Sequence, residues 1–146
     1  LAIGHSARDT FEMLHDKGVF IKAKPFSVGF RIEHEQSVID DARFGKNAGN
    51  PILGAADYKL VHHCKNGRSV YSFCMCPGGI VAPCATAPGE VVTNGWSPSK
   101  RNNPYSNSGI VVAIHPEDFD NYETDPFVCL NFQKKVEVDE MFLKQK

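Results

Sequence analysis

The chain has 146 residues, of which 42% are hydrophobic and 23% are charged, a composition typical of one soluble globular domain. Its formal net charge of −1 at pH 7 gives no electrostatic argument for a nucleic acid or an anionic membrane as partner, and we expect neither. No apolar run approaches the roughly 20 residues of a membrane-spanning helix, and five cysteines outside any secreted-type spacing favour a reducing, cytoplasmic setting.

The first eighteen residues have the pattern of a strand end followed by a helix. Leu1 to Ile3 are apolar, Ser6 is a predicted N-cap with Asp9 at the capping-box position, and Gly18 is placed to end the helix in a left-handed conformation. The amides at such a helix start can hold a phosphate. An ordinary turn between a strand and a helix has the same pattern.

A strand, a helix and a loop are predicted next. Val19 to Ile21 predicts a short strand, and Phe26 to His34 alternates apolar and polar residues, which is typical of a strand with one face on the core. Glu35 to Phe44 predicts a short helix. Residues 45–54 are dense in Gly, Asn and Pro and predict a loop.

The centre of the chain predicts a hairpin that ends in a glycine pair. Asn66-Gly67 separates Tyr58–Cys64 from Ser69–Cys76 and favours a two-residue type I′ turn. Strand alternation would place Cys74 and Cys76 on one face. The following Pro77-Gly78-Gly79 lets a main chain approach a ligand closely, although a tight turn uses the same residues.

The last third of the chain predicts further strands and a terminal helix. Ile80–Cys84 and Glu90–Thr93 form a predicted hairpin, followed by a long polar loop from Asn94 to Ser108 of a kind that often carries function. Gly109–Ile114 is an apolar strand. From Phe127 onward the apolar spacing is helical.

Several long motifs in this order resemble a family of largely uncharacterised FAD-dependent dehydrogenases, two-domain flavoproteins of bacteria and plastids. The motifs are Ile3–Thr10, Lys24–His34, Gly54–Leu60, Tyr71–Gly79, Val91–Gly95 and Asn107–Val112. In that family a Gly-x-Gly-x-x-Gly turn precedes the matching segment and a closing FAD-binding stretch follows it. The resemblance implies an internal segment of a longer flavoprotein.

The resemblance implies an α+β fold, an antiparallel-β-rich domain with two or three flanking helices, inserted into a Rossmann-like FAD domain of the parent protein. Residues 1–18 would form the edge of the FAD domain, residues 19–126 the β-rich substrate domain, and residues 127–146 a truncated C-terminal helix. The implied partners are a small-molecule substrate and the rest of the parent FAD domain. FAD would bind the parent and bind this segment weakly or not at all.

The resemblance also implies which residues lie near the cofactor. The predicted cofactor-binding residues are Gly4, His5, Ser6, Pro77, Gly78, Gly79, Asn94 and Gly95, and the predicted catalytic residues are Cys76 and Arg101. A flavin performs the hydride chemistry itself, so these residues would orient the reactants and stabilise charge.

Three other functions remain open from the sequence. His62, His63, Cys64, Cys74, Cys76 and Cys84 are donors suited to zinc, although Cys74-x-Cys76 lacks the usual Cys-x-x-Cys spacing, and we predict no metal site. Cys76 could instead perform thiol chemistry if a nearby cation lowered its pKa. The segment could also be a non-catalytic interaction domain.

Overall fold

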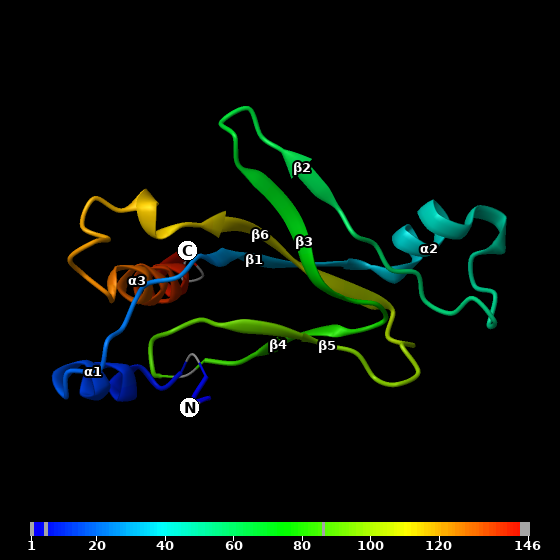
Figure 1. Ribbon diagram of the computed structural model, residues 1–146. Coiled ribbons are helices and arrows are strands. Elements are labelled where there is room, and N and C mark those ends of the chain that lie inside the picture. The colour runs from blue at the N-terminus through cyan, green and yellow to red at the C-terminus, as the bar shows by residue number, and fades with distance from the viewer. Residues whose placement is uncertain (1, 5, 86, 144–146) are drawn as a thin grey trace. The chain divides into compact units, whose positions relative to one another are not determined.

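The computed structural model describes residues 2–4, 6–85 and 87–143, with the backbone alone for 139–143. The described residues form an α+β fold with a four-stranded antiparallel sheet, a two-stranded antiparallel sheet and three α-helices, which confirms the predicted fold class. The chain divides into two compact units (Figure 1). Unit 1 comprises residues 1–25, 86–90 and 115–146, and unit 2 comprises residues 26–85 and 91–114. The predicted division at residues 18 and 126 concerns the parent protein and stays a prediction.

The larger sheet lies in unit 2 and has the order β1-β6-β3-β2. Its strands are β1 (Phe26–Glu35), β2 (Val61–His63), β3 (Ser69–Cys76) and β6 (Tyr105–Ile114). β1 and β6 pair over their whole length, from Phe26 opposite Ile114 to Glu35 opposite Tyr105. The alternation of β1 predicts this strand correctly, but Phe30 on its apolar side is 66% exposed in this chain.

β6 begins earlier than the sequence predicts. The expected loop from Asn94 to Ser108 is instead β5 (Thr93–Trp96), a loop of residues 97–104, and the polar first half of β6. Ser106, Asn107 and Ser108 are fully buried. A hydropathy pattern does not detect this part of the strand, because its side chains are polar. Its place in the sheet depends instead on backbone pairing with β1.

The turn between β2 and β3 also differs from the prediction. Cys64 N–H donates to Arg68 O at 2.7 Å, which leaves a three-residue loop, and only Gly67 of the Asn-Gly pair has a positive φ, +84°. The type I′ expectation is therefore wrong, as is the long strand over Tyr58–Cys64. The Asn66 side chain accepts a hydrogen bond from Arg68 N–H at 3.2 Å instead. Three-residue hairpin loops commonly place a left-handed glycine last.

A bulge interrupts β3 near its end. Its register against β6 shifts between Phe73 and Cys76, and Cys74 has a φ of +49°. An extra residue in one strand breaks the alternation of side chains. Cys74 is therefore exposed while Cys76 is buried, and the prediction that they share one face is wrong.

The remaining elements of unit 2 are a small hairpin and a helix. β4 (Ile80–Pro83) pairs antiparallel with β5, so the predicted second hairpin is confirmed with a later return strand than Glu90–Thr93. α2 (Gln36–Phe44) follows β1 directly, as predicted, and leads into the 3₁₀ helix η1 (Gly45–Asn47). In Figure 1, α2 extends from the end of β1.

Unit 1 contains α1 (Arg8–Asp16), the 3₁₀ helix η2 (Pro116–Asp118) and α3 (Val128–Leu143), the predicted terminal helix. Ala7, not Ser6, occupies the N-cap position of α1, and no side chain caps the helix. The predicted capping box is wrong because the Asp9 carboxylate accepts from Thr10 N–H at 2.8 Å. Gly18 has a φ of +78° at the helix end, as predicted. Residues 19–21 form no strand.

A buried ion cluster joins three segments of unit 1. Arg8 Nη1 lies 2.8 Å from Glu90 Oε1, and Arg8 Nη2 lies 2.5 Å from Glu137 Oε2. The three side chains are between 6% and 13% exposed. One guanidinium therefore pairs with two carboxylates that are largely shielded from water.

No helix among residues 2–4, 6–85 and 87–143 is long and apolar enough to cross a membrane. The cytoplasmic setting stays a prediction.

Candidate functional site

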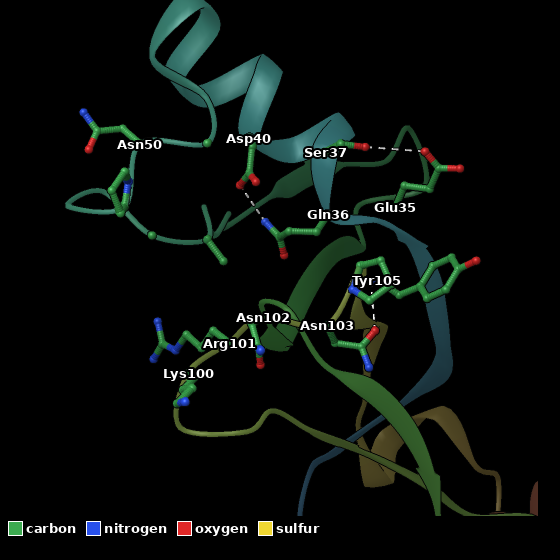
Figure 2. Close-up of a pocket in the computed structure, with 15 residues that line it drawn as sticks. Glu35, Gln36, Ser37, Asp40, Asn50, Lys100, Arg101, Asn102, Asn103 and Tyr105 are labelled. Atoms are coloured by element: carbon green, nitrogen blue, oxygen red, sulfur yellow. Dashed lines mark hydrogen bonds between the residues drawn. The ribbon is translucent and has the colours of Figure 1, made fainter.

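A polar pocket of about 630 Å³ lies in unit 2, and we call it the α2 pocket. The first turn of α2 forms one wall, the glycine-rich loop around Gly49 and Gly54 forms a second, and residues 100–105 form the third. Figure 2 shows Gln36 and Ser37 across an open space from Lys100 and Arg101. The pocket therefore assembles three segments that are distant in sequence.

Gln36 joins these segments and is only 6% exposed. Its backbone N–H donates to Pro104 O at 2.8 Å, and its Nε2 donates to Asp40 Oδ1 at 2.8 Å and Ala56 O at 2.9 Å. Its Oε1 accepts from Gly78 N–H at 2.8 Å. Two acceptors on one side and a donor on the other determine the orientation of the amide. Sequence reasoning missed this residue, because nothing distinguishes a buried glutamine from the usual exposed one.

The glycine pair lets two loops pack closely. A Cβ at Gly78 would lie 1.9 Å from the carbonyl oxygen of Arg101, and one at Gly79 would lie 2.3 Å from that of Trp96. Gly78 and Arg101 both have a φ of +48°. The space that a side chain would fill here is occupied by the loop of residues 97–104, and this contact places Arg101 at the α2 pocket.

A second contact involves the buried polar cluster beneath β5. A Cβ at Gly95 would lie within 2.5 Å of Arg31 Nη1, Asn107 Oδ1 and Cys76 Sγ. Arg31 Nη1 donates to Asn107 Oδ1 at 2.7 Å and to Cys74 O at 3.0 Å. The Nδ2 atom of Asn107 is buried and has no hydrogen-bond partner in the structure. The β5 backbone therefore lies directly on this cluster.

The structure brings together most of the predicted site residues. Cys76, Pro77, Gly78, Gly79, Asn94, Gly95 and Arg101 all lie in unit 2. Gly4 and Ser6 lie in unit 1, whose position relative to unit 2 is not determined, and His5 lies outside the described residues. Of the predicted residues that the structure describes, Arg101 alone lines the α2 pocket. The catalytic and cofactor roles of these residues stay predictions.

The α2 pocket has charges of both signs. Lys100 and Arg101 are exposed on one wall. Glu35 and Asp40 lie on the wall formed by the start of α2. Asp40 Oδ1 already accepts hydrogen bonds from Ala56 N–H at 2.8 Å and from Gln36. The wall of Lys100 and Arg101 suits an anionic group, such as a phosphate or a carboxylate.

The structure also places the residues of the zinc and thiol chemistries considered from the sequence. Among the residues that the structure describes, no group of three or more His, Cys, Asp or Glu side chains is arranged to hold a metal ion. All five cysteines are free thiols. The Cys76 thiol is buried and lies 3.4 Å from the carbonyl oxygen of Cys74.

We expect the thiols to differ sharply in reactivity. Burial, with smaller contributions from Asp118 and Glu117, raises the pKa of the Cys129 thiol, and this side chain is also inaccessible. Because the thiolate is the reactive form, Cys129 should react with iodoacetamide at least about tenfold more slowly than exposed Cys74 or Cys84. Mass spectrometry of timed alkylation measures each rate. Equal rates in the native chain would contradict the buried placement, and equal rates in urea are the control.

Two comparisons with known proteins cover most of the chain. The family described as "FAD-dependent protein, C-terminal domain-like" matches residues 25–145. An uncharacterised protein of Clostridium beijerinckii is 46% identical over 138 residues, which cover 94% of this chain and 26% of the relative. The chain thus spans about a quarter of the length of the relative that it matches.

Proposed function

The chain belongs to the FAD-dependent protein, C-terminal domain-like family, and from that premise we propose that it is a segment of a flavin-dependent oxidoreductase. The family match, which extends over residues 25–145, is the observation that carries the proposal. FAD, when bound to the parent protein, would supply hydride or electron transfer to or from a small molecule. The dehydrogenase reaction, the inserted position of the segment in a Rossmann-like FAD domain, and the use of NAD(P) belong to the same proposal.

The α2 pocket is the part of this segment that we propose faces the reactants. Lys100 and Arg101 would hold an anionic group of the flavin or the substrate, since both cations are exposed on one wall of the pocket. The hydrogen bonds of Gln36 to Gly78 and Pro104 would keep that wall in position. The role of the chain is therefore binding and orientation, and the isolated segment would be inactive.

Absorbance spectroscopy tests the proposal on two proteins. We expect the purified Clostridium beijerinckii relative to show the visible bands of bound flavin, and this chain to be colourless or to shift the spectrum of added FAD only weakly. Zinc is determined on both samples. A relative without flavin under conditions that retain other flavoproteins' cofactors would refute the flavoprotein proposal, and stoichiometric zinc in such a flavin-free sample would favour the His and Cys donors instead.

Charge removal at the cationic wall should weaken anion binding. We expect Arg101→Gln to raise the Kd for FAD or for inorganic phosphate by about tenfold, because a charge-assisted hydrogen bond contributes roughly 1.5–3 kcal/mol. Isothermal titration at low salt measures the change. Lys65→Gln, an exposed lysine in the β2–β3 turn, is the matched control and should leave the Kd unchanged. Equal effects of the two substitutions would indicate nonspecific attraction.

A further inference from the structure

A second concave site of unit 2 has a different chemistry from the α2 pocket. It is an apolar groove of about 370 Å³ on the face of β1 where α2 and residues 57–60 pack, and we call it the relay groove. Ile32, Ile39, Ala42 and Leu60 supply its apolar surface. Its size suits a molecule of one or two rings.

Two polar aromatic side chains lie in this apolar surface and form a hydrogen-bonded chain. The Tyr58 hydroxyl lies 2.8 Å from His34 Nε2, and His34 Nδ1 lies 2.9 Å from Ser106 Oγ. Ser106 is fully buried, so its hydroxyl is held beneath the groove and not offered to solvent. A neutral imidazole donates from one nitrogen and accepts at the other. The hydrogen bonds from Tyr58 through His34 to Ser106 can therefore be donated in either direction.

Tyr58 lines the groove, and its hydroxyl hydrogen-bonds with Ser108 as well as with His34. Tyr58 is half-buried, and burial raises the pKa of its phenol, although a hydrogen bond with Ser108 and the charge of Arg31 act in the opposite direction. The phenol therefore stays protonated at neutral pH. A hydroxyl has one donor and two acceptor positions, and His34 and Ser108 use two of these three, so one position remains for a ligand.

The charged residues that line the groove give it no net charge that would favour an ionic ligand. Arg43 and Asp57 both line it, and their formal charges cancel. The rings of His34 and Tyr58 lie 5.5 Å apart at 42° and offer aromatic surface. Aromatic side chains contact planar rings well.

We propose that the relay groove binds a small neutral molecule with a planar apolar body and one hydroxyl or carbonyl oxygen, which hydrogen-bonds to the Tyr58 hydroxyl. This site is separate from the α2 pocket and does not depend on the flavin proposal. The chain of Tyr58, His34 and Ser106 orients the oxygen, and the apolar residues contact the body of the molecule.

The test compares p-cresol with toluene, which differ by one hydroxyl, as probes for the 146-residue chain. Backbone amide NMR spectra are recorded during each titration. We expect p-cresol to shift resonances of residues 32–43 and 57–60 and to bind about fivefold more tightly than toluene, the equivalent of one ordinary hydrogen bond. Tyr58→Phe should remove this preference, and Tyr122→Phe, an exposed tyrosine in unit 1, should not.

A second variant tests the groove independently, in case Tyr58→Phe does not fold. Ala42 is exposed, so Ala42→Phe should leave the fold intact, fill the groove and abolish the binding of both probes. Equal affinity of p-cresol and toluene, or shifts confined to other residues, would overturn the proposal. Concentration-dependent shifts of the same resonances without a probe would also overturn it, because they would show that a second copy covers the groove.

Discussion

Gly78→Ala should lower the free energy of unfolding by about 2–5 kcal/mol. A residue with a side chain at a φ of +48° costs roughly 1–2 kcal/mol, and the new Cβ would meet the backbone oxygen of Arg101 at 1.9 Å, an overpacking cost of a further 1–3 kcal/mol. A backbone atom cannot rotate away as a side chain can. Denaturant unfolding of both proteins measures the difference.

Gly54→Ala separates the two costs of this substitution. Gly54 has a φ of +66°, and a Cβ there would meet nothing within 4 Å, so only the backbone cost of about 1–2 kcal/mol should appear. We also expect Gly78→Ala to shift the NMR resonances of Gln36 and Asn103, whose hydrogen bonds to Gly78 would be lost. Equal losses of stability in the two variants would mean that the loop of residues 97–104 is not packed on the glycine pair.

Arg8→Met should lower the free energy of unfolding by about 3–5 kcal/mol. The substitution retains apolar volume but removes the guanidinium that pairs with Glu90 and Glu137, two like-charged carboxylates at side-chain exposures of 6% and 9%. Breaking a buried ion pair on one side costs more than the pair contributes, because the remaining charge loses its counter-charge without gaining solvation. Thermal and denaturant unfolding of the whole chain measure the loss.

Two further variants identify the cause of that loss. Adding Glu90→Gln and Glu137→Gln to Arg8→Met should recover at least half of the stability, since neutral amides require no counter-charge. Lys17→Met removes an exposed cation at the end of the same helix and should change the stability by less than about 0.5 kcal/mol. If Arg8→Met lowered the free energy of unfolding by less than about 1 kcal/mol, the guanidinium would be solvated and not part of a buried ion cluster.

The elements with a strong local pattern are the ones that sequence reasoning predicts well. β1 alternates over its length, α2 and α3 keep helical spacing, and Gly18 ends α1 in the predicted conformation. Each of these depends on residues a few positions apart, whose geometry a short segment already determines. The α+β class follows from them.

The errors fall where distant residues decide the local structure. Ser106 to Ser108 look like loop but are buried strand, because β1 and β3 pair with them on both sides. The bulge that separates Cys74 from Cys76 cannot be read from alternation, since it inserts one residue into an otherwise regular strand. The turn at Gly67 differs by one residue from the expected type.

The sequence alone determined the fold class, the main helices and strands, and the resemblance to FAD-dependent proteins, because these depend on local periodicity and on motif order. Only the tertiary structure decided what the glycine pair does, since it packs against Trp96 at the end of β5 and against Arg101 in the following loop, about twenty residues later in the chain. It also decided the roles of Gln36 and of the chain from Tyr58 through His34 to Ser106. A hydrogen bond between residues far apart in sequence leaves no periodic signal, so the α2 pocket and the relay groove emerge only when the chain is folded.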